Sequence, residues 1–360
     1  MDNKRVGIAG AGRMGRAIAW AMERLGYDLV IIDQSEEALN ECKNILKHSH
    51  HTFEVFECAP DGVFNMLKDC KTVIASLPYH QNLGLAIFCI DNKIKYFDLG
   101  GSVSVSNRIN EASYAYGNTP VMTDLGLAPG WANIIAENLY KEYRIENHKP
   151  PNNIVMMVGG LPKEPMNSLN YSCTWSYDGL INEYKEDCIV LVHGETSIQK
   201  SMGGLESVQT SIGNLEAFYT SGGTAHTLRT MKNRGVKNCS YKTLRYPGHH
   251  TIVNFLIHES GLDDEALIKI FKKTCPPQKD LVIIKVQVDD VLNGNGIMSF
   301  QKVIKSDSQF SAMQKATAFP IASVAHTVAM SHAYKPVLKY DDIEYPEFNK
   351  WLEYLFEEVN

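Results

Sequence analysis

The segment at residues 6–33 restricts the possible folds of this chain more than any other part of its sequence. An apolar run at residues 6–9 leads into GAGRMG (residues 10–15), a helical run follows, and a second apolar run ends at Asp33. In such a turn Gly10 permits the tight bend, Gly12 lets the backbone approach a pyrophosphate, and Gly15 lets helix and strand pack closely. The unpaired N–H groups at the helix start favour phosphate. We therefore predict a dinucleotide site whose turn residues are Gly10, Gly12, Arg13, Met14 and Gly15.

Asp33 bears on which dinucleotide is bound. A carboxylate at the end of the second strand can accept hydrogen bonds from both ribose hydroxyls, and its charge repels a 2′-phosphate. Gln34 and Ser35 come next, without an Arg or Lys that would attract such a phosphate. The sequence therefore favours NAD over NADP. The alternative interpretation of Asp33 is a solvated acid at a strand end.

Composition excludes several classes of protein. The chain has 360 residues, a formal net charge of -6 and 44% hydrophobic residues, which is typical of a globular protein with two domains. It has no basic cluster, so nucleic acid is not an expected partner. No apolar run reaches the roughly 18 residues of a membrane span, so we expect neither a membrane segment nor a targeting segment. The eight cysteines lack zinc-ligand spacing, which predicts reduced thiols, a cytoplasmic location and no metal site.

Residues 1–124 alternate apolar strands with helical stretches, which is the pattern of a parallel sheet covered by helices on both faces. We predict the α/β class, with a Rossmann doubly wound parallel sheet as the NAD-binding domain. Such sheets bind ligands beyond the carboxyl ends of their strands. The loops that follow predicted strands are residues 77–80, 98–102 and 124–130.

Residues 125–309 have a different pattern. Strand-like runs lie at 154–158, 189–192, 241–246, 280–289 and 297–303, and residues 291–296 are typical of a hairpin turn. We predict an α+β substrate-binding domain with a mixed or antiparallel sheet. Residues 310–345 begin with a helical pattern despite Pro320, and we expect this segment to pack back on the first domain as a C-terminal helix.

Motifs from residue 123 onward resemble those of one enzyme family. They are TDLGLAPGW (123–131), GGLP (159–162), YSCTWS (171–176), GLINEY (179–184), GNLEAFYTSGGT (213–224) and KTLRYPGH (242–249). In this order they resemble the saccharopine dehydrogenase-like oxidoreductases. The loops DLGG (98–101) and DLGLAPG (124–130) most resemble the lysine 6-dehydrogenase branch. The resemblance implies hydride exchange at a C–N bond, an amino-acid substrate, and a homodimer formed through the second domain.

The resemblance also implies cofactor contacts outside the glycine turn. Leu77 and Pro78 match the position where a family member packs along the cofactor ring, although Pro78 also suits a plain strand end. The loop with Asp98, Leu99 and Gly100 is assigned to the cofactor on the same basis. Residues 128–130 (APG) would open a helix on the nicotinamide side, or alternatively form a rigid joint between domains.

Trp175 and Glu183 are the pair most directly implied for the substrate. In relatives that handle lysine and polyamines, the matching aromatic and acidic side chains hold a cationic amine. A Trp face attracts ammonium by about 0.5–2 kcal/mol, and a carboxylate adds a directional ion pair. Glu183 is also a candidate base for the proton that the ammonium loses. The alternative is a core Trp and a solvated Glu.

Arg245, His249 and Asp124 complete the candidate catalytic set. Arg245 suits a bidentate clamp for an α-carboxylate, or it pairs with a structural acid. His249 follows a Pro-Gly turn and is a candidate proton carrier, although adjacent histidines are more often structural. Asp124 begins the loop expected near the nicotinamide. Weaker candidates for the cavity lining are Glu216 and Thr224.

These residues lead us to expect NAD-dependent oxidation of the side-chain amine of a basic amino acid, with lysine as the first candidate. A second interpretation is reductive condensation of an aldehyde with an amine, which gives saccharopine or a carboxypolyamine. That reaction needs a cation for a second carboxylate, for which the candidates are Arg229, Arg234 and Lys242. A third is an NAD-bound sensor without turnover.

Overall fold

The computed structural model describes residues 5–48, 50–55, 64–117, 119–290, 295–331 and 335–359. The chain forms two compact units: unit 1 comprises Met1–Trp131 and Gln314–Asn360, and unit 2 comprises Ala132–Met313. The sequence places the two boundaries after residues 124 and 309, slightly earlier in each case. The last part of the chain thus returns to the unit that the first part begins.

Unit 1 contains a six-stranded sheet in which every pair of neighbouring strands is parallel. Its order is β3-β2-β1-β4-β5-β6, formed by β1 (Arg5–Ala9), β2 (Asp28–Asp33), β3 (Thr52–Val55), β4 (Thr72–Ala75), β5 (Lys95–Asp98) and β6 (Val121–Met122). The strand order reverses between β1 and β4, which is where doubly wound sheets bind their ligands. The predicted Rossmann sheet is confirmed.

Helices connect these strands: α1 (Arg13–Arg24), α2 (Glu36–Ile45), η1 (Asn65–Leu67), α3 (Tyr79–Asp91) and α4 (Val103–Tyr116). Right-handed crossovers place α1 and α2 on one face of the sheet and α3 and α4 on the other. The strands are buried on both faces and are therefore almost continuously apolar, as in the buried pattern of β2 and β4.

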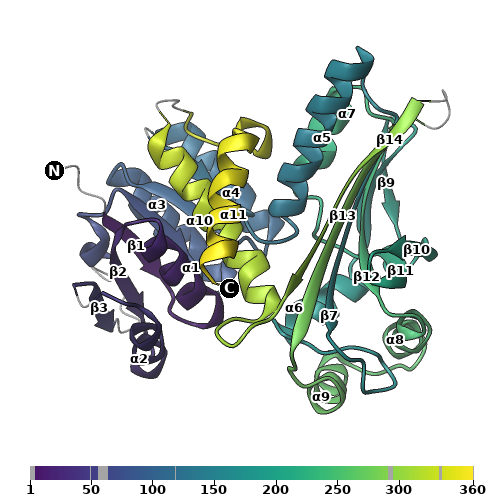
Figure 1. Ribbon diagram of the computed structural model, residues 1–360, viewed down its shortest axis with the longest axis horizontal. Helices are drawn as coiled ribbons and strands as arrows, with labels where there is room; N and C mark the ends of the chain where they lie inside the picture. Colours follow the sequence, from purple (N-terminus) through teal and green to yellow (C-terminus); the bar gives the residue numbers. More distant parts are fainter. Residues whose placement is uncertain are drawn as a thin grey trace. The chain divides into compact units, whose positions relative to one another are not determined.

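The C-terminal segment of unit 1 is two helices rather than the single one expected over residues 310–345. α10 (Ala312–Met330) and α11 (Tyr345–Glu358) are separated by the short η3 (Tyr340–Asp342). α10 is largely apolar and almost entirely buried, as a helix enclosed by a domain is. Phe319 of α10 stacks on Trp20 of α1, with ring centroids 5.5 Å apart, and meets Phe356 of α11 edge-on. Figure 1 shows α10 and α11 beside α1.

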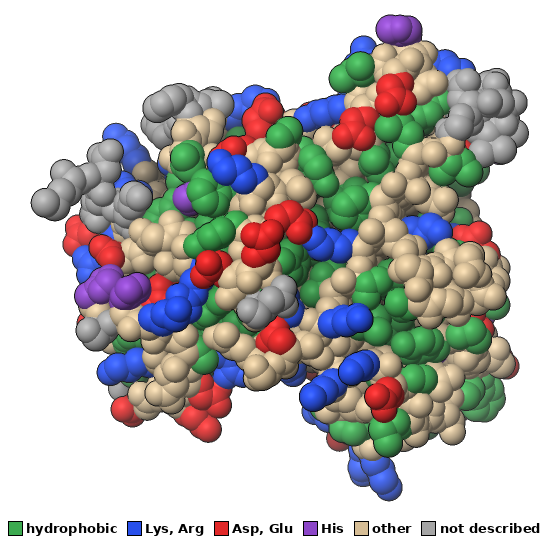
Figure 2. All heavy atoms as spheres, in the orientation of Figure 1, with side chains coloured by type: hydrophobic (Ala, Val, Ile, Leu, Met, Phe, Trp, Pro, Cys, Tyr) green, Lys and Arg blue, Asp and Glu red, His purple; other side chains and the backbone are tan. Residues whose placement is uncertain are grey.

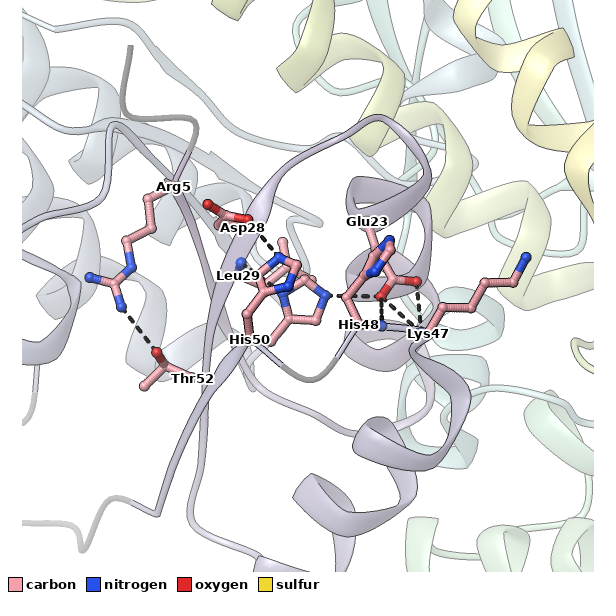
Figure 3. Close-up of polar contacts among 9 residues, drawn as sticks. Arg5, Glu23, Asp28, Leu29, Lys47, His48, His50 and Thr52 are labelled. Atoms are coloured by element: carbon pink, nitrogen blue, oxygen red, sulfur yellow. Dashed lines mark hydrogen bonds and ion pairs between the residues drawn. The ribbon is translucent and has the colours of Figure 1, made fainter. Parts of the chain in front are cut away.

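A buried carboxylate, Glu23, fixes the loop between α2 and β3 (Figure 3). It accepts hydrogen bonds from the backbone N–H groups of Lys47 and His48 and from Nε2 of His51 at 2.9 Å. Burial alone would raise the pKa of Glu23, but these N–H donors lower it below its usual value. His51 in turn accepts the N–H of Leu29 through Nδ1. Figure 2 shows a surface group of histidine side chains over β2 and β3, whereas His51 itself is buried.

Unit 2 is built on one mixed sheet, as predicted. Its main order is β10-β11-β12-β7-β13-β14, and β8 pairs with β12 and β9. Only β7 and β12 run parallel. The strands are β7 (Asn153–Pro162), β8 (Cys188–Val192), β9 (Glu195–Gln199), β10 (Glu206–Thr210), β11 (Gly213–Tyr219), β12 (Asn238–Arg245), β13 (Asp280–Asp290) and β14 (Asn295–Lys305). In the predicted hairpin turn between β13 and β14, residues 291–294 lie outside the described residues.

The sheet of unit 2 is strongly curled. Nζ of Lys285 in β13 donates to the carbonyl of Gln209 in β10 at 2.8 Å, although three strands separate β10 and β13 in the sheet order. The inner face holds an apolar cluster that includes Met157, Leu244 and Ile283. Side chains alternate along a strand, so Tyr241, Thr243 and Arg245 of β12 project from the opposite face.

Helices cover that opposite face and one end of the sheet. α6 (Tyr177–Lys185), α8 (His249–His258) and α9 (Asp264–Thr274) share a buried apolar cluster with Phe218 of β11. α5 (Trp131–Asn147) and α7 (Thr227–Asn233) lie toward the other end of the sheet (Figure 1). Residues of β12 on this face therefore lie beneath α6 and α8.

Candidate functional site

Each of the three positions in the β1–α1 turn has a different structural reason for being glycine. Gly10 has a φ of +97°, and a Cβ there would lie 2.4 Å from the carbonyl oxygen of Ser76. A Cβ on Gly15 would lie 1.8 Å from the carbonyl oxygen of Gly10. A Cβ on Gly12 would have no atom within 4 Å. Close packing thus requires the first and third glycines. The second faces open space that a ligand pyrophosphate would fit.

Asp33 lies against this turn. Its Oδ2 accepts the N–H of Ala11 at 2.6 Å, and its Oδ1 accepts the N–H of Ser35 at 2.8 Å. Each carboxylate oxygen has lone pairs left for further donors such as ribose hydroxyls. Of the other predicted turn residues, Arg13 is exposed and Met14 is half-buried. Open space at Gly12, the α1 N-terminus and Asp33 together fit a nicotinamide dinucleotide.

Leu77 and Pro78 lie where the strand β4 ends, next to the same turn. The Leu77 side chain would be 3.4 Å from a Cβ on Gly10, and the N–H of Ser76 donates to the carbonyl of Ala9. Pro78 is exposed and directly precedes α3. The position of Leu77 beside the turn agrees with a cofactor contact. The position of Pro78 directly before α3 agrees with the alternative, a plain strand end.

The structure places Asp98 differently from the expectation of a side chain that touches the cofactor. Asp98 is 1% exposed, and its Oδ1 accepts the N–H groups of Gly100 at 2.8 Å and Asp124 at 3.1 Å. Its Oδ2 is buried without a hydrogen-bond partner among the described residues. Burial, helped by the charge of Asp124, raises the pKa of Asp98 to about 7. Its carboxyl therefore joins two loops, while the half-buried Leu99 and Gly100 remain accessible.

Asp124 is half-buried and has the left-handed φ of +62°. Its two carboxylate oxygens accept the hydroxyls of Ser106 and Thr123, each at 3.0 Å. Its carbonyl accepts the hydroxyl of Tyr340 at 2.7 Å. Burial raises the pKa of Asp124 also. These contacts hold Asp124 in place; a catalytic role for it stays a prediction.

Arg245 is a buried cation whose hydrogen-bond partners are neutral groups. It is 3% exposed, its Nε donates to the hydroxyl of Tyr184 at 2.9 Å, and its Nη1 donates to the carbonyl of Leu244 at 2.9 Å. The ring of Tyr171 lies 4.6 Å from the guanidinium carbon. Among the described residues, Arg245 has no ion pair within salt-bridge distance, and Nη2 has no hydrogen-bond partner.

Glu183 lies in the last turn of α6 and is half-buried. Burial raises the pKa of its carboxyl to about 7, although the charge of Arg245 opposes this shift. Its backbone carbonyl accepts hydrogen bonds from the hydroxyl of Ser201 and the N–H of Ser221, and these bonds fix the end of the helix. Within the described part of the chain, its carboxyl oxygens accept no hydrogen bond. Glu183 is therefore a carboxyl near a buried cation, with a pKa suited to proton transfer at neutral pH.

Trp175 is placed by two local contacts. Its indole N–H donates to the hydroxyl of Tyr171 at 3.3 Å. A Cβ on Gly179 would lie 2.6 Å from Cζ3 of the indole, so the ring lies against the helix at that glycine. Gly179 and Glu183 are four residues apart and therefore lie on one side of α6, and Trp175 comes just before this helix. The missing side chain at Gly179 makes room for the indole ring, which fills the space where a Cβ would lie.

His249 does not fit the expected role of proton carrier. Its ring is 0% exposed, Nδ1 lies 2.7 Å from the carbonyl oxygen of Leu169, and Nε2 lies 3.0 Å from the hydroxyl of Tyr184. Burial and the charge of Arg245 lower the pKa of His249 to about 3. A neutral ring with both nitrogens occupied has no free position for a substrate proton. Desolvation, invisible in the sequence, is the reason.

Two weaker candidates also have structural partners. The carboxylate of Glu216 accepts the N–H groups of Gly248 and His250 at the start of α8, which is a helix-capping role. Lys242 donates to the carbonyl of Gly204 and the carboxylate of Glu206. Sequence reasoning did not assign Tyr184 or Tyr171, although both lie in the motifs that carry the family resemblance.

The fold and the turn define an oxidoreductase that uses a nicotinamide cofactor. The chain belongs to the saccharopine dehydrogenase family: residues 6–124 match the model described as the saccharopine dehydrogenase NADP binding domain. Residues 126–358 match the saccharopine dehydrogenase C-terminal domain. These matches confirm the family, whereas the lysine 6-dehydrogenase branch stays a prediction.

One of the following solved structures, with a TM-score of 0.78, supports the fold. The chain is similar to saccharopine dehydrogenase (L-Glu forming) from Saccharomyces cerevisiae, with a TM-score of 0.78, 13% identity, and coverage of 99% of this chain and 97% of that one. A dehydrogenase from Clostridium difficile matches with a TM-score of 0.42 and 11% identity over 99% and 98% of the chains. A myo-inositol dehydrogenase from Corynebacterium glutamicum matches with 0.44 and 12% over 98% and 94%. The yeast structure supports the shared two-unit architecture.

The residues that the structure describes lack two further features. They contain no group of three or more His, Cys, Asp or Glu side chains that could hold a metal ion. No helix in the same ranges has the length and apolar character needed to cross a membrane.

Proposed function

We propose that this protein catalyses NAD-dependent oxidation of the side-chain amine of a basic amino acid. L-lysine is the first candidate: its ε-amine becomes an imine, and water releases ammonia and 2-aminoadipate 6-semialdehyde, which cyclises. In this reaction the C–H hydride and its electron pair leave the substrate, and one proton is released. The cofactor, when bound, supplies the hydride acceptor.

The buried, unpaired guanidinium of Arg245 carries this proposal. A buried charge is costly unless an opposite charge compensates it. The described neighbours of Arg245 in hydrogen-bond contact are neutral, and Glu183 is only partly ionised at neutral pH because its pKa is about 7. A substrate carboxylate at Arg245 would supply the missing negative charge, which favours an amino acid as the ligand.

Glu183 and Trp175 support the assignment of an amine. With a pKa of about 7, the Glu183 carboxylate can accept the proton of a substrate ammonium, and the neutral amine can then expel hydride. The half-buried Trp175, whose indole packs against Gly179, offers an aromatic face for the cation.

Asp33 supports NAD as the cofactor. Its carboxylate lies on the glycine turn through the N–H of Ala11, so a 2′-phosphate near it would meet a negative charge. The family model matched by residues 6–124 is described as NADP-binding, so cofactor choice needs a direct test.

The family assignment equally favours a second candidate, reductive formation of saccharopine or a carboxypolyamine. That substrate needs a second cation. Lys242 is bound to Glu206 and Arg234 to Glu137, which leaves the exposed Arg229 as the remaining sequence candidate.

The test follows the absorbance of NADH or NADPH with lysine, ornithine, saccharopine and diaminopimelate, each with NAD and with NADP. We expect turnover with lysine and NAD. Turnover with saccharopine alone would replace the lysine assignment by the second candidate. Cofactor binding without turnover of any substrate would favour the sensor. Arg245→Met serves as the matched variant, since it keeps an unbranched side chain and removes the charge.

A further inference from the structure

We infer that Tyr184, which is hydrogen-bonded to His249, is a positioning residue. It occupies one edge of the Arg245 guanidinium and leaves another edge for binding a carboxylate. The inference rests on the proposed function in that it takes the ligand to be an amino acid. It assigns Tyr184, for which the sequence indicates no role, and gives His249 a role other than proton transfer.

The direction of every hydrogen bond in this chain of contacts is determined. The carbonyl of Leu169 can only accept, so Nδ1 of His249 carries the proton and donates across 2.7 Å. Nε2 of the neutral ring must then accept, and the hydroxyl of Tyr184 donates to it across 3.0 Å. The same hydroxyl oxygen accepts Nε–H of Arg245 across 2.9 Å. We call Leu169, His249, Tyr184 and Arg245, in this order, the relay.

The relay connects separate parts of unit 2. Arg245 ends β12, Tyr184 lies in α6 and His249 begins α8. His249 and Tyr184 are completely buried, and the ring of Phe218 stacks on His249. Buried hydrogen bonds of this kind restrict rotation about the side-chain bonds of their partners. The helical layer thus determines the orientation of the guanidinium on the sheet.

This arrangement leaves one edge of the guanidinium for a ligand. A carboxylate can bind side-on to Nε and Nη2, or end-on to Nη1 and Nη2. Tyr184 occupies Nε, which excludes the side-on edge. Nη1 uses one N–H for the carbonyl of Leu244, and its second N–H and both N–H groups of Nη2 have no partner among the described residues. Tyr171 covers one face of the plane. A substrate carboxylate would therefore bind end-on.

Tyr184→Phe tests the relay because it removes only the hydroxyl. We compare binding of L-lysine with that of 1,5-diaminopentane, which is lysine without its carboxylate, by calorimetry of the whole chain with NADH. We expect lysine affinity to fall about tenfold and diaminopentane affinity to stay unchanged, because only the carboxylate uses Arg245. Equal weakening of both ligands, or no weakening of either, would overturn the inference.

Tyr177→Phe is the matched control. Tyr177 lies in the same helix, and its hydroxyl donates to the carbonyl of Cys275 rather than to the relay. We expect this variant to bind both ligands as the wild type does. His249→Gln is the conservative variant, since its amide oxygen can accept from Tyr184. It should retain more lysine affinity than His249→Leu, and equal losses in both would contradict the role of Nε2 as acceptor.

A measurement without substrate separates failure of the relay from failure of the proposed function. The ¹⁵N chemical shifts of the His249 ring should show the neutral Nδ1–H tautomer between about pH 5 and 8. The Nε2–H tautomer, or titration of the ring in that range, would refute the relay even if Tyr184→Phe does not fold. The expected tautomer with no lysine binding to the wild type would instead reject lysine as the ligand while leaving the relay intact.

Discussion

Burial controls the chemistry of the ionisable side chains more than their sequence neighbours do. Asp98 and Glu183 have raised pKa values and His249 a lowered one, and in all three the largest cause is the removal of water from the charged form. The consequences differ. Glu183 is half-buried and can exchange protons with a ligand, whereas Asp98 and His249 are buried and act on other residues.

Glu183→Gln tests the proposed base at this scale. We expect kcat/KM for lysine to fall about 10²-fold, because the amide cannot accept a proton. In the wild type, activity should rise with pH through about 7 as the carboxyl ionises, and the variant should lose that rise. The measurement is a pH–rate profile. Glu186→Gln, at the end of the same helix, is the control and should keep the rise. A variant that keeps the wild-type profile would exclude Glu183 as the base.

Asp98→Asn tests the buried carboxyl through stability. Its pKa is raised from 3.8 to about 7 on folding, so between these values the native state binds more protons than the unfolded state. The free energy of unfolding of the wild type therefore decreases as pH rises through this window. The variant lacks this loss, so its stability relative to the wild type should increase, on the order of 2 kcal/mol between about pH 4 and 7. Urea unfolding at several pH values measures it; parallel curves would contradict the shift.

At the scale of elements, short local contacts set the geometry of the cofactor turn. Gly10 and Gly15 lie against neighbouring backbone, and Asp33 accepts the N–H of Ala11 inside the turn. The loop before β3 is held in a similar way by Glu23 (Figure 3). In both places one carboxylate satisfies backbone donors that would otherwise lack partners.

Gly12→Ala and Gly15→Ala form a matched pair for this turn. Gly12 has a φ of −61° and open space around a Cβ, so alanine there should leave stability nearly unchanged and weaken NADH binding by about tenfold or more. Alanine at Gly15 would meet the carbonyl of Gly10 and should destabilise unit 1 by about 1–3 kcal/mol. Fluorescence titration with NADH and urea unfolding separate the two effects. Unchanged NADH affinity in Gly12→Ala would contradict a pyrophosphate at this glycine.

At the scale of the whole molecule, the chain leaves unit 1 after Trp131 and returns to it at Gln314. The returning helices supply core residues that the first part of the chain lacks, including Phe319 between Trp20 and Phe356. Unit 1 is therefore complete only when the whole chain has been made.

Phe319→Ala tests whether the returning helices stabilise unit 1 selectively. Removal of this fully buried ring should cost about 3–5 kcal/mol. We expect faster amide hydrogen exchange in β1 and β4 and unchanged exchange in β12 and β13, measured by mass spectrometry. Equal loss of protection in both units would show that they unfold together. Phe255→Ala in α8, where the ring is 52% exposed, is the control and should change neither.

Several features could be predicted because they depend on neighbours in the sequence. Strand, turn and helix at residues 5–24 follow from apolar runs and glycine spacing, and the parallel sheet follows from the alternation of elements. β9, β10 and β11 were not predicted, because their exposed faces are polar and the apolar alternation is weak, as in β10 with two buried residues of five. A single helix over residues 310–345 was expected, but α10 ends at Met330, and η3 and α11 follow as separate helices.

The sequence by itself determined the cofactor turn, the acid that follows β2 and the family motifs, since each depends on residues close together in the chain. Only the tertiary structure decided what the candidate catalytic residues can do. It buries His249 as a neutral partner of Tyr184, hides the Asp98 carboxyl between two loops, and leaves Arg245 without a counter-ion. The physical reason is that desolvation and hydrogen-bond geometry depend on side chains brought together from distant segments, and no local sequence pattern predicts these contacts.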